Sequence, residues 1–292
     1  MPTQAAQEHD VTHFFTVDVE EHFQVQALAA AVPRSRWSTE ESRVEPSVFE
    51  LLALLEASSS TATFFVLGWL AERRPALVRA IVDAGHELAS HGWDHRLVTK
   101  QSRTEFRESI RRSKCVLESV GGQRVLGFRA PSFSIVRGGE WALDCLIEEG
   151  FLYDSSLFPV RRPGYGYAGG EGDPYWVSRP AGRLAEFPPA TLRFGGVRVP
   201  AGGGAYFRLL PYGLVRSAFR LAARRQRPGT FYIHPWELDP DQPRYAVGRS
   251  TRIRHYGGLN RTRPRLRRLL REFRFGAIGP ALLDNRILVP TA

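Results

Sequence analysis

The sequence has 292 residues, of which 43% are hydrophobic and 24% are charged. This length and composition suit the core of one large α/β domain or of two small ones, and they exclude disordered, collagen-like and coiled-coil proteins. The formal net charge of +10 comes almost entirely from arginine, since lysine occurs only at Lys100 and Lys114. The excess indicates either an anionic partner, such as nucleic acid, an acidic glycan or a membrane surface, or a basic protein whose charges are merely scattered.

The two cysteines, Cys115 and Cys145, both fall in helix-like patterns. We therefore expect buried thiols rather than a disulfide framework or a zinc ribbon. The first ten residues are polar and lack the apolar centre of a secretory signal, and no stretch reaches the ~18 apolar residues of a membrane span. We expect a cytoplasmic protein, with peripheral contact to the inner membrane as an alternative.

Apolar runs and helical periodicities alternate along the chain. Runs rich in β-branched and aromatic residues predict buried strands, and apolar residues three or four positions apart predict amphipathic helices. The predicted strands cover residues 13–19, 61–67, 86–90, 124–128, 151–154 and 230–234, and the predicted helices cover residues 46–57, 75–84, 104–118, 141–149 and 264–273.

This alternation, with its short connections, predicts an α/β fold with a parallel sheet, either open or closed into a barrel. Between about residues 159 and 212, glycine, proline and aromatic residues replace the helical periodicity, so we expect an irregular insertion with short strands over one mouth of the barrel. The chain is expected to form a single domain over residues 1–292, with a core over about 12–238 and a C-terminal extension over about 239–292. Candidate site residues follow the strand ends, where parallel α/β folds place their chemistry.

Two histidines, His91 and His95, follow the strand predicted over residues 86–90. Their four-residue separation lets both point the same way if the segment turns helically, and imidazole suits zinc and other divalent metals. Gly92 would let the backbone bend close to an ion. Two histidines at this spacing are also common by chance, so the motif alone leaves open a metal site and an ordinary pair of surface or core histidines.

Two carboxylates, Asp18 and Glu20, end the first predicted strand and lie on one face of it, because strand side chains alternate. Such a pair is costly unless it binds a cation or shares protons. Together with His91 and His95, one carboxylate completes a two-histidine, one-carboxylate set that leaves metal positions for water and substrate. A solvated strand end, with Glu21 adjacent, is the alternative.

Ordered motifs extend this pattern from about residue 14 to residue 234. They are FTVDVE, TATFFVLGWLAERRPALVRAIVDAGHELASHGWDH, GFRAPSFS, FLYDSS and FYIHPWE. In order, spacing and strand context they resemble the polysaccharide deacetylase (NodB-homology) superfamily of carbohydrate esterases. The segments EEHFQV, GGAYFRLLPY, FYIHPWELDP and RHYGGL resemble one bacterial subfamily that is associated with exopolysaccharide loci of the PEP-CTERM/exosortase type. The resemblance implies a distorted (β/α) barrel of about seven parallel strands that hydrolyses N-acetyl groups of amino sugars with a bound metal.

The resemblance also implies the roles of the metal-site residues. Asp18 matches the general base, and His91 and His95 match the two histidine ligands. The family usually has a second aspartate directly after the first, but Val19 stands there. Glu20 is therefore the expected carboxylate ligand, and an exchange of roles between Glu20 and Asp18 stays open.

Further catalytic roles follow from the remaining motifs. Arg129 matches the arginine that orients the base Asp18. His234 matches the histidine that protonates the leaving amine, and Asp154 matches the aspartate that raises the pKa of that histidine. Ser132 occupies the position whose backbone N–H stabilises the oxyanion.

Four more side chains are candidates for substrate contact, and the metal and partners follow from the same resemblance. Ile233 would line the acetyl pocket, Trp93 and Trp236 would stack on a sugar ring, and Tyr206 would border the substrate groove. The expected cofactor is one divalent metal, with zinc favoured over iron, cobalt, nickel and manganese. The expected partner is an amino-sugar polysaccharide or lipid-linked glycan, with no nucleic acid.

Two other functions compete with this prediction. One is a metal-dependent amidohydrolase that acts on a small non-sugar amide. The other is a non-catalytic barrel that binds glycan or nucleic acid through its arginines. The arginines within residues 261–274 would contact an acidic glycan or a membrane, or form a solvated helix face. The sequence assigns no role to His255.

Overall fold

The computed structural model describes residues 11–162 and 164–284. Residues 1–10, in which the sequence showed no secretory signal, lie outside the described part, as does the end of the predicted single domain at residues 285–292. None of the helices in the described ranges combines the length and the apolar composition needed to cross a lipid bilayer.

A mostly parallel sheet forms the centre of the molecule, and within the described residues seven of its strands follow one another in parallel in the order β10–β1–β2–β3–β4–β5–β7, while a further strand, β11, pairs in parallel with β1 outside this order. Pro189, just beyond β7, bridges in parallel to Thr230 of β10, so the sheet closes into a distorted barrel. This confirms the predicted (β/α) barrel. The strands are β1 (Thr12–Val19), β2 (Thr63–Val66), β3 (Glu87–Ser90), β4 (Gly127–Phe128), β5 (Tyr153–Asp154), β7 (Gly182–Glu186) and β10 (Thr230–Ile233).

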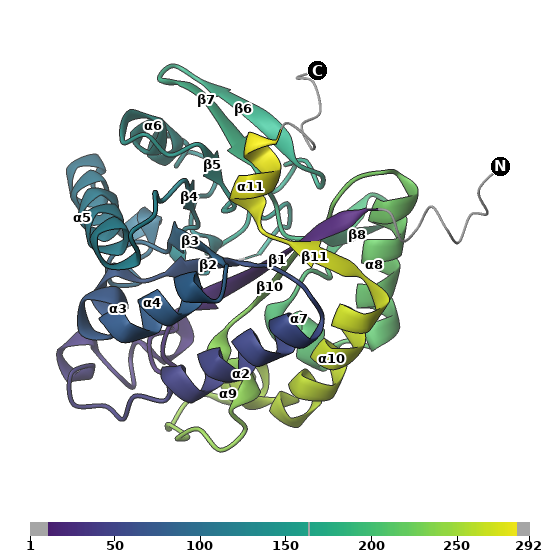
Figure 1. The fold of residues 1–292 in the computed structure, drawn as a ribbon, viewed down its shortest axis with the longest axis horizontal. Helices are drawn as coiled ribbons and strands as arrows, with labels where there is room; N and C mark the ends of the chain where they lie inside the picture. The colour runs from purple at the N-terminus through teal and green to yellow at the C-terminus, as the bar shows by residue number, and fades with distance from the viewer. Residues whose placement is uncertain (1–10, 163, 285–292) are drawn as a thin grey trace.

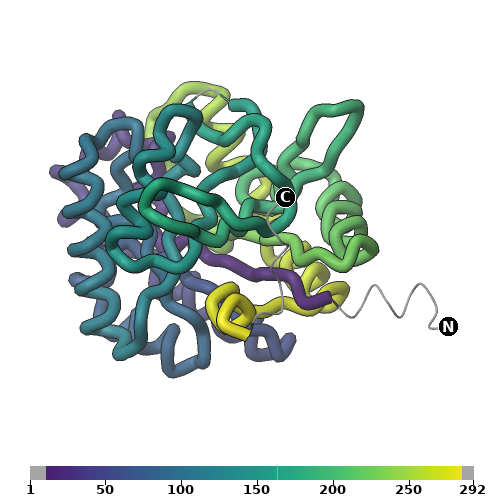
Figure 2. Tube along the Cα trace, turned by 90° about the horizontal axis from the view of Figure 1, so that it is seen from above, coloured from purple at the N-terminus to yellow at the C-terminus, as the bar shows by residue number. Residues whose placement is uncertain are grey.

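Helices surround this sheet, as Figures 1 and 2 show, with β1 running through the middle of the molecule. Outward residues of the strands, such as Phe15, Val17 and Phe128, share one buried cluster with the apolar faces of the helices. The longest helix begins with a capping box between Ser102 and Glu105. The helices are α2 (Val44–Ala57), α3 (Gly68–Arg73), α4 (Pro75–Asp83), α5 (Arg103–Gly121), α6 (Trp141–Glu148), α7 (Gly204–Leu209), α8 (Tyr212–Arg224), α9 (Arg249–Tyr256), α10 (Thr262–Glu272) and α11 (Ile278–Leu283).

The amino end of the barrel is filled by inward side chains. Phe14, Phe65, Tyr153 and Phe187 form a second buried cluster, which also contains residues of α11. Strand β11 (Arg274–Gly276) pairs with β1 and leads the chain into α11. Since this end is packed with aromatic rings, only the carboxyl end of the barrel is left to form a site.

The glycine- and proline-rich segment contains the short strands that the sequence predicted, and they are arranged in two hairpins. Strand β6 (Tyr175–Arg179) pairs antiparallel with β7 in a hairpin that projects beyond the helices (Figure 1). A second hairpin joins β8 (Thr191–Phe194) to β9 (Val197–Pro200). Its turn is Gly195–Gly196, and both residues have positive φ, as two-residue hairpin turns require. The bounds of these strands were not predicted, because strands of four or five residues give little periodicity.

Short 3₁₀ turns complete the described chain and carry several site residues. They are Gln26–Leu28, Arg34–Arg36, Val98–Lys100, Pro131–Phe133, Pro235–Leu238 and Leu259–Arg261. The turns at Pro131–Phe133 and Pro235–Leu238 come directly after barrel strands, and each begins with proline, whose fixed φ suits a first helical position.

Candidate active site

A pocket of about 350 Å³ opens at the carboxyl end of the barrel. Its wall combines residues that follow β1, β3, β4 and β10 with residues of α7 and α9. The predicted residues that line it are Asp18, Glu20, His91, His95, Ser132, Tyr206, His234 and Trp236, and His255 lines it as well.

The three predicted metal ligands lie together. One ligand atom each from Glu20, His91 and His95 falls within 4.8 Å of the others, and all three residues are buried. The backbone between the two histidines is unusual, since Gly92 has φ of 77° and His95 has φ of 57°. These conformations let both imidazoles point toward the same place. A non-glycine residue in this region is uncommon and tends to mark a functional site.

The donor atoms of this cluster fit a divalent cation. His91 donates from Nδ1 to the Arg129 carbonyl at 2.8 Å, which leaves its Nε2 for a metal. Burial lowers the pKa of His91 to about 4, so the imidazole is neutral, which is the form that binds metals. Glu20 Oε2 lies 2.8 Å from His95 Nε2, yet it makes no hydrogen bond of ordinary geometry with any described residue. Buried carboxylate oxygens are normally satisfied, so this one suits a metal ligand.

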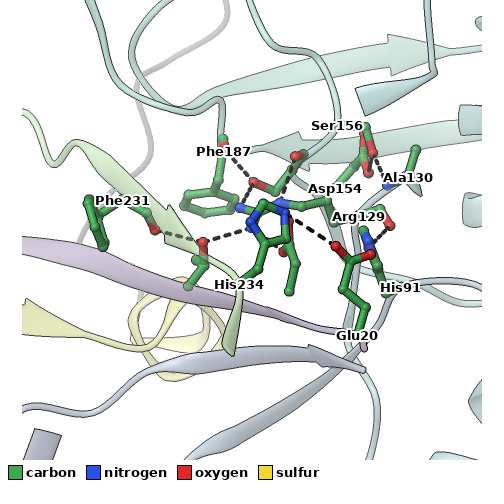
Figure 3. A network of polar contacts seen from close by, with 12 residues as sticks. Glu20, His91, Arg129, Ala130, Asp154, Ser156, Phe187, Phe231 and His234 are labelled. Atoms are coloured by element: carbon green, nitrogen blue, oxygen red, sulfur yellow. Dashed lines mark hydrogen bonds and ion pairs between the residues drawn. The ribbon is translucent and has the colours of Figure 1, made fainter. Parts of the chain in front are cut away.

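Asp18 is bound by Arg129, which belongs to the polar network that Figure 3 draws together with Glu20, His91 and His234. The fully buried guanidinium donates from Nη1 to Asp18 Oδ1 at 2.7 Å and to Thr16 Oγ1 at 2.8 Å. It also donates from Nη2 to Ser155 Oγ at 2.7 Å. These contacts fix one carboxylate oxygen of Asp18, while Oδ2 faces His234 Nε2 at 3.8 Å.

His234 is placed to carry a proton. Its Nδ1 donates to Glu237 Oε1 at 2.8 Å, and Glu237 Oε2 accepts from Arg208 Nε at 2.6 Å. Burial alone would lower the pKa of His234, but the hydrogen bond to Glu237 and the charges of Glu20, Glu237 and Asp18 outweigh it and raise the pKa to about 9. The imidazole is therefore protonated at neutral pH, as a general acid requires.

The carboxylate partner of His234 is Glu237, so the role predicted for Asp154 is wrong. Side chains alternate along β5, so Ser155 points into the barrel and Asp154 points away from it. Asp154 Oδ1 accepts from Ser156 Oγ at 2.5 Å, and its carboxyl group pairs with that of Glu186 on β7. Burial raises the pKa of Asp154 to about 6 and that of Glu186 well above its usual value. The carboxylates that lie near His234 among the described residues are those of Asp18, Glu20 and Glu237, and Asp154 is not one of them.

Two predicted substrate contacts, Trp93 and Ile233, do not line the pocket. The ring of Trp93 lies against Gly68, where an added Cβ would come within 2.5 Å of it, and the Arg112 guanidinium stacks 3.4 Å from its centre. Ile233 belongs to the helix-side core, because alternation along β10 turns its neighbours Tyr232 and His234 into the pocket instead. Ile233 was predicted wrongly because neighbouring side chains of a strand face opposite ways. Trp93 lies in the irregular segment between the two histidines, where its ring packs against Gly68 instead of the pocket.

The other predicted substrate contacts do line the pocket. Ser132 has φ of 54°, a left-handed conformation imposed by the turn after β4. Trp236 donates from Nε1 to Glu20 Oε1 at 3.1 Å and is stacked between His234 and His255, with ring centres 5.0 Å and 4.4 Å away. Trp236 thus orients the carboxylate ligand.

Glu237 and Arg208 are functional residues that the sequence reasoning missed. Glu237 could have been found in the motif HPWE, because a turn that starts at Pro235 brings the third residue back to the histidine. Arg208 has no local signal, since it lies on α7 and reaches Glu237 only through the fold.

A change of Glu237 to Gln is expected to lower the pKa of His234, because it removes the charge and weakens the hydrogen bond that hold the imidazolium. The alkaline limb of the kcat/KM profile should move to lower pH, since the acid form of His234 would be lost earlier. Activity at pH 6 should suffer less than activity at pH 9. The pH dependence of kcat/KM for the two proteins tests this, and an unchanged alkaline limb contradicts it.

Comparisons with known proteins agree with this geometry. Residues 39–137 match the family model described as Polysaccharide deacetylase, and residues 155–282 match the one described as Domain of unknown function (DUF3473). The first match contains His91, His95 and Arg129, whereas the second contains His234 and Glu237. The site is thus assembled from both matched segments, together with Asp18 and Glu20, which precede them.

Two curated relatives match part of the chain. Peptidoglycan deacetylase-like protein FGM2 of Gibberella zeae is 34% identical over 112 residues, which are 38% of this chain and 32% of that protein. Peptidoglycan-N-acetylglucosamine deacetylase PgdA of Listeria monocytogenes is 37% identical over 81 residues, which are 27% of this chain and 17% of that protein. The matched part therefore spans about a third or less of the length of these relatives.

A solved structure shares the whole fold. The crystal structure described as a polysaccharide deacetylase from Mycobacterium smegmatis has a TM-score of 0.63 with 20% sequence identity, and it covers 97% of this chain and 94% of that chain. At this identity the likeness shows the fold alone.

Proposed function

Because this chain carries a polysaccharide deacetylase domain of the NodB/CE4 family, we propose that it is a metal-dependent hydrolase that removes N-acetyl groups from amino sugars of a polysaccharide. One observation carries the proposal. The cluster of Glu20, His91 and His95 shares a pocket with a carboxylate held by arginine, Asp18, and with a protonated histidine, His234. These are the parts that metal-assisted amide hydrolysis needs.

Glu20, His91 and His95 would hold the metal. A divalent cation there supplies Lewis-acid polarisation of the acetyl carbonyl and favours loss of a proton from water. Zinc is the proposed metal, because two imidazoles and one carboxylate suit it, although iron, cobalt, nickel and manganese fit the same donors. Trp236 donates to Glu20 Oε1, the oxygen that does not face His95, and so fixes the orientation of the carboxylate.

Asp18 acts as the general base in this proposal. Arg129 binds its Oδ1, so Oδ2 is the oxygen that accepts a proton from the attacking water. The water oxygen then bonds to the acetyl carbon. Thr16 and Ser155, both buried, hold the guanidinium in place, so the base needs no reorganisation during the reaction.

His234 acts as the general acid. As the bond between the acetyl carbon and the sugar nitrogen breaks, His234 donates its Nε2 proton to the nitrogen, and the products are acetate and a free amino sugar. Its Nε2 lies 3.8 Å from Asp18 Oδ2 and 3.7 Å from Glu20 Oε1, so acid and base face the same space. Glu237 keeps the proton on this histidine until it is needed.

The proposed substrate is a polymer rather than a small amide. The pocket is open at the carboxyl end of the barrel and bordered by Tyr165, Tyr206 and Trp236, whose rings suit the apolar faces of sugars. The two curated relatives are named for deacetylation of peptidoglycan. We further propose an exopolysaccharide as the natural polymer, in line with the segments that resemble the exosortase-associated subfamily.

Release of acetate from defined substrates tests the proposal. The zinc-loaded protein is expected to deacetylate N-acetylglucosamine tetramers and to act at least about a hundredfold less well on small cyclic and linear amides, which lack the remote contacts that support the transition state. Equal or better activity on the small amides would assign the site to another amidohydrolase. Absence of activity together with salt-sensitive glycan or nucleic-acid binding would favour a binding protein.

A further inference from the structure

A second hollow, of about 400 Å³, adjoins the active-site pocket. The two share four wall residues, Tyr165, Ala205, Tyr206 and Arg254, so they lie side by side. Arg162 and Leu209 complete the wall of the second hollow, which we name the arginine hollow. A polymer whose acetylated sugar reaches Asp18 and His234 would place a neighbouring unit near these side chains.

The polar groups of the arginine hollow form a short chain of hydrogen bonds. The hydroxyls of Tyr165 and Tyr206 lie 2.7 Å apart. Arg162 donates from Nε to the Tyr206 hydroxyl at 3.2 Å, and Arg254 donates from Nη2 to the Tyr165 hydroxyl at 3.2 Å. Each guanidinium carries five N–H donors, so most of them remain available to a ligand.

The positive charge of the arginine hollow has no counterpart. Among the described residues, no carboxylate lies within ion-pair distance of Arg162 or Arg254, and the wall contains no acidic residue. Some arginines of the chain are paired with a carboxylate, as Arg179 is with Asp144 at 2.8 Å and Arg263 is with Glu50. Two neighbouring cations held to the same pair of phenols favour an anion between them.

The positive surface continues beyond Arg162. That residue also borders a third hollow, of about 560 Å³, whose wall contains Arg161, Arg193 and Arg198 with one acidic residue, Glu171. In the C-terminal arginine cluster, two arginines are already engaged within the protein. Arg265 donates to backbone carbonyls around α7, and Arg268 is paired with Glu272.

The arginine hollow is fixed to the catalytic acid. Arg208, which bonds Glu237 at 2.6 Å, also donates from Nη2 to the carbonyl of Arg254 at 2.9 Å and from Nη1 to the carbonyl of Gly257. Helix α9, which carries Arg254, is therefore held by the same side chain that supports His234 through Glu237. An anion bound at Arg254 would be positioned relative to the reacting sugar.

We propose that the arginine hollow is a subsite for an anionic group, a carboxylate or a phosphate, carried by the glycan next to the acetylated sugar. This inference rests on the proposed deacetylase function and adds to it the substrate class, an acidic rather than a neutral amino-sugar glycan. In this proposal Arg162 and Arg254 bind the anion, and the hydrogen bonds from these arginines to Tyr206 and Tyr165 keep the two guanidinium groups on either side of it.

Three acetylated substrates test the proposal and separate the two sources of the anion. They are a neutral N-acetylglucosamine tetramer, a hyaluronan tetrasaccharide for the carboxylate, and UDP-N-acetylglucosamine for the phosphate. We expect kcat/KM of the unmodified protein to be about tenfold higher on one anionic substrate than on the neutral one. Arg254→Gln should remove most of that ratio. Arg252→Gln, which removes the same charge from an exposed position of α9 outside both hollows, should keep it.

The outcomes distinguish this proposal from the proposed function. If kcat/KM on the neutral tetramer is as high as on both anionic substrates, the proposed subsite is wrong, and the proposed deacetylase function is still supported. If the metal-loaded protein releases acetate from none of them, the deacetylase falls, and calorimetric titration with tetragalacturonate, which carries carboxylates and no acetyl group, decides on the subsite. Binding that Arg254→Gln loses and Arg252→Gln keeps supports it, and absence of binding overturns it.

Discussion

Replacement of His91 by alanine is expected to remove the metal and the activity together. His91 supplies one of three donors within 4.8 Å, and its Nδ1 bond to the Arg129 carbonyl fixes the ring that presents Nε2. Loss of a supporting contact alone typically lowers metal affinity about ten- to a hundredfold, so loss of a ligand should cost more than about a hundredfold. Metal content of the purified variant and its rate of acetate release measure both effects.

His86→Gln is the matched control for this variant. His86 is also a buried histidine, but it precedes β3 while His91 follows it, and its ring lies 5.1 Å from that of Phe64. We expect this variant to keep its metal. If His91→Ala retains full metal content and activity while its circular dichroism matches the unmodified protein, the metal site is elsewhere.

Asp18→Asn is expected to abolish most of the activity and to leave the metal bound. The amide can still accept the hydrogen bond from Arg129 Nη1 through its oxygen, so the local structure should persist. It cannot take a proton from water, and loss of a general base lowers rates by about a hundred- to ten-thousand-fold. The fall should appear in kcat, because the group acts in the transition state.

The metal content of the Asp18→Asn variant separates the two carboxylates. Asp18 lies with Arg129 and Glu20 lies with the histidines, so Glu20→Gln should lose metal while Asp18→Asn should keep it. Asp144→Asn changes another buried aspartate paired with an arginine, outside the pocket, and should leave kcat unchanged. Metal loss in Asp18→Asn would instead make Asp18 the carboxylate ligand and Glu20 the general base.

Strand alternation explains which site residues the sequence could predict. Asp18 and Glu20 follow a run whose outward members, such as Val17, enter the helix-side core, so both carboxylates point to the pocket. The same rule, applied to β5 and β10, would have turned Asp154 and Ile233 away from the site. The roles of these two residues were predicted wrongly because they were assigned from position in a motif and not from the face of the strand on which each side chain lies.

Other features depend on contacts that no local pattern carries. Arg208 and Arg254 reach the site from α7 and α9, and each does so by bonds to residues more than twenty positions away. The barrel itself was predictable, because six strand-like runs alternate with amphipathic helices. Strand β7 was not predicted, since its residues, GRLAE, include no β-branched or aromatic side chain.

Acetate release before and after removal of the metal tests whether this chain is a metal-dependent deacetylase. We expect the purified protein to hold about one divalent ion per chain at Glu20, His91 and His95. A chelator should abolish acetate release from N-acetylated amino-sugar oligomers, and added zinc should restore it. Acetate release that persists in the metal-free protein, or none from any amino sugar by the fully loaded protein, would contradict this function.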